Sequence, residues 1–421
     1  MKMKNYIGLV LLICWGPLMA QSGSYSLSQL RDAARQNYPE FKRKGITEKR
    51  YSLEMDKLWK LLYPKMTFNA QASWQSAVTS IPANIPGVEV QKRDQYKAFV
   101  DVNQVLWDGG IVKRQLDLRE SQQAAEQKAI DVSLNKVQEQ IDLLFFSSLL
   151  LQDRAEQLEL VATTIENKLK QVKGAVSNGV MLESNVWLLE AELVKNGQMQ
   201  TELAAQRETA LRILGEWTGL SIDANTKFEQ RRKQVLPMSP VIKRPELELF
   251  SLQKRSIDAG IAAVDAKYMP RIYGFAQLGY GRPGLNFLDT RFRPWAMVGA
   301  RFTWDIFDWG AGKIDKETIG LQKELLKVQE EAFERQTEIG LIQVEEDLGK
   351  LNKLLVQDDA LIVLRGKIKA TASAQLDNGV ITATEYLDRV NEETAAKLSK
   401  NLHEIQILMT QAKYGYITGN N

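Results

Sequence analysis

Apolar residues recur along a long stretch of the chain in the pattern of a coiled coil. From residue 111 to residue 173 there is neither glycine nor proline, and apolar positions follow one another at spacings of four and three. This pattern is typical of a helix that packs along a single seam. A helix from Asp108 to Val176 would be roughly 100 Å long at ~1.5 Å per residue, which is wider than a compact domain. The seam positions are Ile130, Leu134, Val137, Ile141, Leu144, Leu151, Ala155, Leu158, Ala162, Ile165, Leu169 and Val172, with Ser148 as a polar interruption.

Four shorter segments alternate apolar and polar residues with period two. They form two pairs, 66–78 with 95–107 and 271–280 with 295–307. Each segment has about the ~10 residues that a strand needs to cross a membrane. A soluble hairpin with one wet face would show the same alternation, so both interpretations stay open at this point. Aromatic residues near the strand ends favour the membrane, because such side chains gather at its interface with water. They are Trp74, Trp295, Trp304, Phe307 and Trp309.

The chain is an internal duplication. The segment Leu-Trp-Asp-Gly-Gly that begins at Leu106 returns as Ile-Phe-Asp-Trp-Gly from Ile306. The apolar seam also returns with its register kept. We therefore assign residues 21–236 to a first repeat and residues 237–421 to a second, each with a helix, a strand pair, a long helix, a tight turn and a second helix. The predicted strand–helix junctions hold Asp108, Gly110, Asp308 and Gly310 at matching places.

An Asn-Gly-Val turn ends the long helix of each repeat. Glycine supplies the left-handed conformation in which helices commonly end, so the turn alone explains it. The apolar residues that follow each glycine are not explained by the turn, since exposed apolar residues at a hairpin tip usually have a partner. The candidate contact residues at the two tips are Gly179, Val180, Met181, Gly379, Val380 and Ile381.

Composition argues against several classes of function. The net charge is +3, and no clustered basic excess suggests nucleic-acid binding. His403 and Cys14 are the only histidine and the only cysteine. A zinc site, a haem site or a catalytic triad would have too few residues to draw on. We therefore expect no enzymatic activity, no cofactor and no metal site, and we expect His403 to be a packing or surface residue.

The N-terminus has the features of a signal peptide over residues 1–20. Basic residues precede an apolar run that is too short to span a bilayer, and Ala20 offers a small residue for cleavage before Gln21. A lipoprotein would instead be cleaved before Cys14 and acylated there, although Ile13 is a poor residue at such a site. No later segment has the ~20 consecutive apolar residues of a spanning helix.

Four strands are too few to close a barrel, since the smallest transmembrane barrels have ~8. Open strand edges are not tolerated in lipid. If these strands cross a membrane, several copies of the chain must therefore share one barrel. The same assembly would bring the helical hairpins together into a long hollow cylinder.

The dipeptide Pro39-Glu40 near the start of the first repeat returns as Pro245-Glu246 in the second. With these duplicated Pro-Glu starts, its strand–helix junctions and its Asn-Gly-Val turns, the chain resembles the TolC-like outer-membrane efflux proteins over about Tyr25 to Gly419. The resemblance implies an α plus transmembrane β fold, in which long α-helical coiled-coil hairpins form a tunnel and four strands per chain contribute to a trimeric twelve-stranded β-barrel. It also implies an outer-membrane location in a Gram-negative cell, with the barrel surrounded by outer-membrane lipid and a large portion of the chain in the periplasm.

The same resemblance implies a passive channel subunit of a tripartite efflux or secretion system. Its partners would be two further copies in a homotrimer, a periplasmic adaptor (membrane fusion) protein at the tips, and an inner-membrane transporter. The rival interpretation is an exported coiled-coil structural or adaptor protein of the envelope without a barrel.

In the family, carboxylates just beyond the second tip ring the inner end of the tunnel. The matching residues are Glu385 and Asp388, which lie one turn apart and would share a helix face. A ring of them would favour cations, and mutual repulsion would raise some of their pKa values. Ordinary solvated helix residues are the alternative. Leu376 and Ile381 stand where the family often has latching residues, so we expect a closed state held more by apolar contact.

Overall fold

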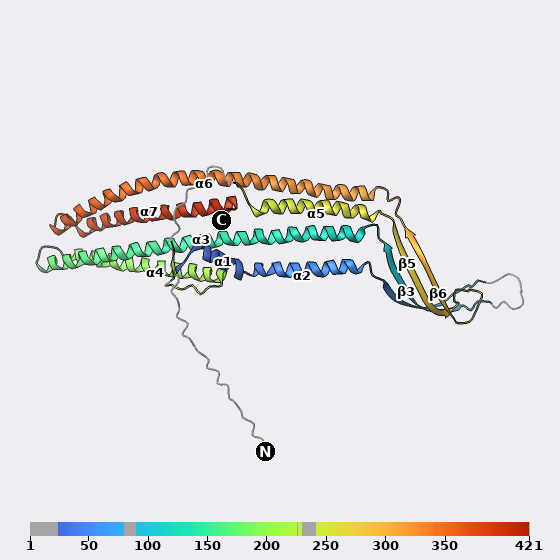
Figure 1. Cartoon of the computed structure of the whole chain (residues 1–421). Helices are drawn as coiled ribbons and strands as arrows, with labels where there is room; N and C mark the ends of the chain where they lie inside the picture. Colours follow the sequence, from blue (N-terminus) through green and yellow to red (C-terminus); the bar gives the residue numbers. More distant parts are fainter. Residues whose placement is uncertain (1–23, 80–89, 225, 230–240, 421) are drawn as a thin grey trace, which may run out of the picture. The chain divides into compact units, whose positions relative to one another are not determined.

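The computed structural model describes residues 24–79, 90–224, 226–229 and 241–420. The predicted signal peptide and the boundary between the two predicted repeats lie outside the described residues. Seven helices and six strands follow one another in the described ranges (Figure 1). The helices are α1 (Leu27–Asn37), α2 (Pro39–Lys60), α3 (Ile111–Ser177), α4 (Ser184–Thr218), α5 (Pro245–Lys267), α6 (Ala311–Asp377) and α7 (Ala383–Thr418). The strands are β1 (Ser24–Tyr25), β2 (Lys65–Trp74), β3 (Asp94–Trp107), β4 (Lys227–Phe228), β5 (Arg271–Arg282) and β6 (Arg293–Thr303).

The predicted duplication is confirmed by the order of the elements. Helices α3 and α6 have 67 residues each, and each is followed by a tight turn and a shorter returning helix. At ~1.5 Å per residue, a helix of this length measures roughly 100 Å. Within the described ranges, none of the helices has an apolar stretch long enough to cross a bilayer.

The chain divides into two compact units. The tip unit comprises the residues up to Asn37 together with Gln140–Val235 and Gly349–Met409, and it contains both hairpin turns. The sheet unit comprises Tyr38–Glu139, Leu236–Leu348 and Thr410–Asn421. Helices α3 and α6 each contribute a portion to both units.

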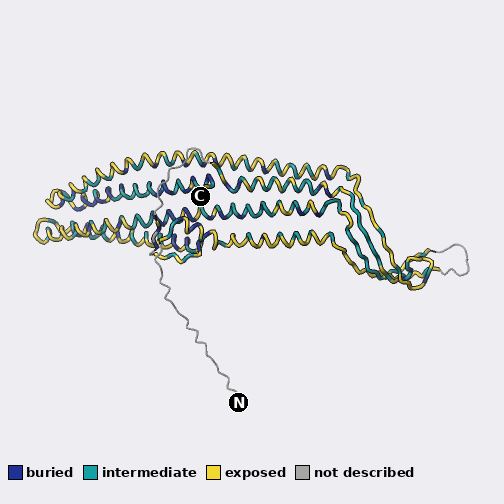
Figure 2. Tube along the Cα trace, viewed as in Figure 1, coloured by how far each residue is buried: buried dark blue, intermediate teal, exposed yellow. Residues whose placement is uncertain are grey.

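The sheet unit holds one four-stranded antiparallel sheet in the order β2-β3-β5-β6 (Figure 1). The register of the strands shows which side chains lie on the same face of the sheet. One row across the four strands is Met66, Val102, Ala276 and Val298, and the next row on the same face is Phe68, Val100, Leu278 and Ala296. Figure 2 shows hardly any buried residue along the strands. The sheet therefore presents a continuous apolar face that the chain itself leaves uncovered.

The opposite face of the sheet is mixed in character. It carries Asp101 and Gln277, whose side chains hydrogen-bond at 2.9 Å, beside a pair of rings, Phe99 and Trp295, with centroids 5.6 Å apart. Gly279 lies between these rings, where a Cβ atom would stand 2.4 Å from the indole of Trp295. Glycine is thus required at this position by close packing.

Ion pairs fix the order of the helices in the sheet unit. Helix α2 is joined to α3 by Arg50 and Glu126, α3 to α5 by Lys128 and Glu248, and α5 to α6 by further pairs. The pairs between α5 and α6 are Lys254–Glu330, Lys316–Asp265 and Lys323–Asp258. Helices α2 and α6 therefore lie at the two edges of this layer, as β2 and β6 lie at the two edges of the sheet.

The elements end a few residues away from the predicted bounds. The last strand stops at Thr303 and not at Phe307, because its partner β5 begins at Arg271 and offers nothing beyond it to pair with. The first strand stops at Trp74 and not at Val78. Helix α3 begins at Ile111 and not at Asp108, because both intervening glycines have positive φ.

Candidate functional site

Both hairpin tips end their long helix with the same Schellman motif. At the first tip the N–H of Gly179 donates to the Val176 carbonyl at 3.0 Å and that of Val180 to the Ala175 carbonyl at 2.9 Å. At the second tip Gly379 and Val380 repeat this pattern at 3.0 and 2.8 Å. The φ angles of the two glycines are 74° and 71°. These bonds satisfy carbonyls that the end of a helix leaves free, so the glycines have a structural role.

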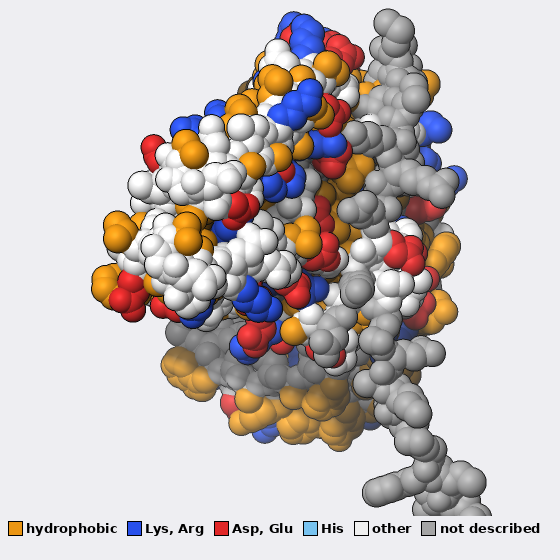
Figure 3. All heavy atoms as spheres, turned by 90° about the vertical axis from the view of Figure 1, so that its left-hand side faces the viewer, with side chains coloured by type: hydrophobic (Ala, Val, Ile, Leu, Met, Phe, Trp, Pro, Cys, Tyr) orange, Lys and Arg blue, Asp and Glu red, His pale blue; other side chains and the backbone are white. Residues whose placement is uncertain are grey.

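The apolar residues beyond the glycines divide into exposed and packed ones. Val180 is 65% exposed and Val380 is 69% exposed, whereas Met181 and Ile381 pack against a buried apolar cluster. Leu182 and Trp187, which the sequence did not single out, are also exposed beside the first tip. Figure 3, seen from the tip end, shows apolar groups interspersed with charged ones. Each tip thus offers an exposed valine on a hydrogen-bonded turn.

One apolar cluster joins the two hairpins near their tips. It includes residues from the four helices of the two hairpins, among them Val172, Val186, Leu376 and Tyr386. Leu376 is fully buried in it. The N–H of Ala383, at the start of α7, donates at 3.0 Å to the Asn185 side chain of the other hairpin. This apolar cluster therefore helps to hold the two hairpins of one chain together, and the apolar latch of a closed state that we expect from Leu376 and Ile381 stays a prediction.

A buried cation adds to this contact. The ammonium of Lys168 on α3 lies 2.9 and 3.1 Å from the two carboxylate oxygens of Asp377, at the end of α6. It also lies 5.2 Å from the centroid of the Tyr386 ring on α7. No repeat or motif marked these three residues, because the pairing joins positions far apart in the sequence.

Glu385, one of the two candidate gate residues, forms a capping box at the start of α7. Its carboxylate accepts the Thr382 N–H at 2.8 Å and the Thr382 hydroxyl at 3.1 Å, while the Thr382 oxygen accepts the Glu385 N–H at 3.3 Å. These hydrogen bonds lower the pKa of Glu385. The pKa rise that we expect for a ring of carboxylates from several chains stays a prediction. Asp388 is exposed one turn further along the helix.

The strand–helix junctions are N-terminal caps for the two long helices. The Asp108 carboxylate accepts the N–H groups of Gly110 and Val112 at 2.9 and 2.8 Å. The Asp308 carboxylate accepts those of Gly310 and Gly312 at 2.9 and 2.6 Å, and these bonds help to lower its pKa. Both carboxylates satisfy donors that the first turn of a helix leaves free and oppose the positive end of its dipole. These four predicted junction residues are thus explained by the start of a helix.

His403 is a packing residue in this structure. Its Nδ1 lies 2.6 Å from a carboxylate oxygen of Asp358, which joins α7 to α6. Both side chains are largely buried. The sole histidine of the chain therefore connects two helices of the tip unit.

Comparison with solved structures identifies the fold. No protein-family model matches the sequence, and no curated protein matches it. The outer-membrane channel OprN matches with a TM-score of 0.72 and 15% identity over 94% of this chain and 90% of its own. The channel-forming protein CusC matches with a TM-score of 0.73 and 12% identity over 94% and 92%. The CmeC outer-membrane channel of Campylobacter jejuni matches with a TM-score of 0.69 and 15% identity over 94% and 85%.

These matches cover nearly the whole of each chain, including the long helices and the four-stranded sheet. They confirm, at the level of the fold, the resemblance to TolC-like proteins that the sequence motifs indicated. This chain has the fold of the outer-membrane channels OprN and CmeC and of the channel-forming protein CusC.

Proposed function

We propose that this protein is the outer-membrane channel subunit of a tripartite efflux or secretion system, a passive conduit without enzymatic activity. The main support is the sheet, whose one face is apolar across all four strands and uncovered by the rest of the chain. In water such a face would be costly, whereas in a bilayer it would contact lipid. This observation disfavours the rival interpretation of a coiled-coil envelope protein without a barrel.

The open edges of the sheet support assembly from several copies. Within the described residues, β2 and β6 each pair on one side only. Unpaired backbone groups cannot remain in lipid, so β6 of one copy would pair with β2 of the next. With four strands per chain, three copies give the twelve-stranded barrel that the resemblance implies.

The helices at the edges of the sheet unit support the same contact between copies. Exposed apolar residues follow α6 at heptad spacing, and others follow α2. Those on α6 are Ile314, Leu321, Leu325 and Val328, and those on α2 are Ile46, Leu53 and Trp59. Exposed seams of this kind are partner surfaces in coiled coils. The α6 seam of one subunit would therefore pack on the α2 seam of its neighbour in a homotrimer.

The tips are proposed to bind a periplasmic adaptor that links the channel to an inner-membrane transporter. The outward side chains of Val180 and Val380 would make the contact, while Met181 and Ile381 would keep the tips rigid. Replacing both valines by aspartate should abolish export and adaptor capture without loss of trimer. The matched control is Leu160→Asp, at a similarly exposed apolar residue of α3 that lies away from the tips and outside the two proposed seams.

We further propose that Glu385 and Asp388 supply the charge at the narrow end of the tunnel. Because its capping hydrogen bonds lower the pKa of Glu385, that carboxylate would stay ionised. The same hydrogen bonds would hold its side chain in one orientation. Both side chains are exposed within a single chain, as a lining position requires.

The proposed membrane face can be tested with two adjacent substitutions. Phe68 and Asn69 are neighbours on β2 and point to opposite faces of the sheet. An arginine on the lipid face of a barrel costs roughly 2–4 kcal/mol at the middle of the bilayer, whereas one facing the lumen costs far less. Phe68→Arg should therefore reduce insertion into the outer membrane much more than Asn69→Arg. Equal effects of the two changes would contradict the proposal.

A further inference from the structure

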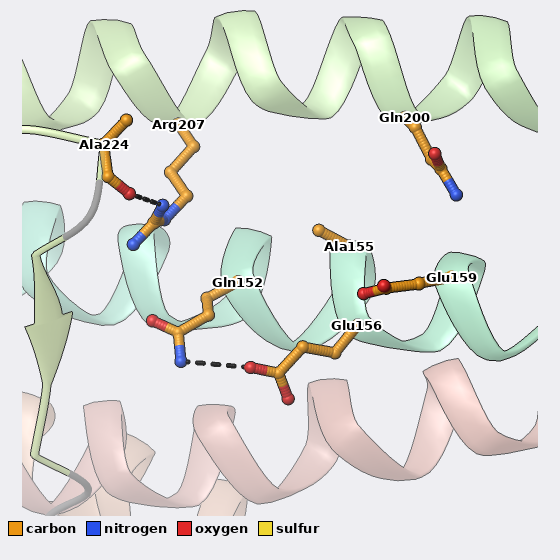
Figure 4. A pocket seen from close by; sticks show the side chains of 7 residues that line it. All are labelled: Gln152, Ala155, Glu156, Glu159, Gln200, Arg207 and Ala224. Atoms are coloured by element: carbon orange, nitrogen blue, oxygen red, sulfur yellow. Dashed lines mark hydrogen bonds between the residues drawn. The ribbon is translucent and has the colours of Figure 1, made fainter.

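A polar pocket of about 570 Å³ opens between α3 and α4 in the tip unit, away from the tips and the junctions (Figure 4). One end is bounded by the segment that follows α4. Its volume is within the range of small-molecule sites and far exceeds that of a single ion. The lining residues are Gln152, Ala155, Glu156, Glu159, Gln200, Arg207 and Ala224.

The guanidinium of Arg207 is already engaged. It donates to the carbonyl of Ala224 at 2.6 Å and to that of Thr226 at 2.7 Å, as the dashed line in Figure 4 shows for Ala224. Arg207 therefore holds the segment after α4 in place. Among the described residues, neither Glu156 nor Glu159 has an ion-pair partner, so the pocket has more negative than positive charge available to a ligand.

Two buried polar atoms of the pocket residues have no hydrogen-bond partner within the described part of the chain. They are the side-chain oxygen Oε1 of Gln152 and the Nε of Arg207. The amide nitrogen of Gln152 is used, since it donates to Glu156 at 3.3 Å. Buried polar atoms are rarely left unpaired, so Oε1 of Gln152 is free to accept a hydrogen bond from a bound molecule.

We propose that this pocket binds a small organic cation that carries N–H donors, such as an alkylammonium or guanidinium compound. Its cationic end would lie between the carboxylates of Glu156 and Glu159 and donate to Oε1 of Gln152. A polar acceptor elsewhere on the same molecule would satisfy the Nε of Arg207. A metal ion is not favoured, because no group of three or more metal-binding side chains occurs among the described residues.

The titration of a neighbouring residue agrees with this shortage of positive charge. Burial, together with the charges of Glu156 on α3 and Glu404 on α7, raises the pKa of Asp153 to about 6. Two cations of the same unit are already engaged, since Arg207 donates to backbone carbonyls and Lys400 pairs with Asp359 at 2.7 Å. A bound cation would stabilise the ionised form of Asp153. Binding should therefore be tighter at pH 8 than at pH 5.5 and should release protons.

The test is isothermal titration of the full-length protein in detergent with agmatine, which carries both an ammonium and a guanidinium group. We expect saturable binding with one site per chain, and none with the uncharged 1,4-butanediol. Glu159→Gln and Glu156→Gln should each weaken binding by about tenfold, because a charge-assisted hydrogen bond is lost. The matched control is Glu166→Gln, at an exposed carboxylate of the same helix, which should bind like the parent.

The absence of saturable binding by a folded protein would overturn the proposal. So would equal weakening in the Glu166→Gln control, since agmatine would then be held by surface charge in general. The thermal melting curve of each variant reports whether it is folded. The result does not depend on the proposed channel function, because binding is measured without transport.

Discussion

The two partners of the Lys168–Asp377 ion pair should respond very differently to mutation. The side chain of Lys168 is 5% exposed, whereas that of Asp377 is 48% exposed. Removing Asp377 leaves a buried ammonium without its carboxylate. Removing Lys168 leaves a carboxylate that water can solvate. The two halves of one contact therefore have unequal effects on the free energy of unfolding.

The expected magnitudes follow from this difference in exposure. Breaking a buried pair from one side costs roughly 3–5 kcal/mol. The Ser373 carbonyl at 3.5 Å and the Tyr386 ring remain near the ammonium, so we expect about 2–3 kcal/mol for Asp377→Ala. Lys168→Met keeps the aliphatic stem and should cost about 1 kcal/mol or less.

The assay is a double-mutant cycle on the detergent-solubilised protein, with denaturant unfolding as the measurement. Once Lys168 is replaced by methionine, Asp377→Ala should lower the free energy of unfolding hardly any further, because no buried ammonium then loses its partner. The coupling between the two sites should then be about 2 kcal/mol. Equal losses in the two single variants, or additive losses in the double variant, would refute this account of how the hairpins are held together.

Three further predictions concern the backbone, the pH dependence and the charge at the tip. Gly379→Ala should destabilise by about 1 kcal/mol in thermal unfolding, because φ is 71° and no atom lies near enough to clash. Asp153 keeps its proton up to about pH 6 when folded, so its contribution to stability is present at low pH and is lost as the pH rises through 6. Asp153→Asn should therefore raise the melting temperature relative to the parent at pH 7.5 but not at pH 4. In single-channel recordings, Glu385→Gln with Asp388→Asn should reduce cation preference, whereas Glu183→Gln near the other tip should leave it unchanged.

The long helices and the sheet were predictable because each has a strong periodic signal. The heptad seam around Ile130 and Ile165 and the alternation from Phe68 onward needed only local sequence. The exact ends of the helices and strands were harder to predict from the sequence. The helix start at Ile111 depends on two glycines with positive φ, and the end of β6 at Thr303 depends on where β5 begins.

The candidate site was predictable in part. The turns at Gly179 and Gly379 could be predicted because glycine readily adopts the positive φ that ends a helix. The Lys168–Asp377 pair could not be inferred, because it joins different repeats and neither residue belongs to a motif. The capping role of Glu385 could have been found, since Thr382 three residues earlier completes a known helix-start signature.

The most direct test of the proposed channel is the native mass of the protein extracted in detergent from the outer-membrane fraction. A sheet with an apolar face and two open edges requires other copies to complete it in lipid. We expect a single species that contains three chains. A stable monomer in the water-soluble fraction would contradict the proposal.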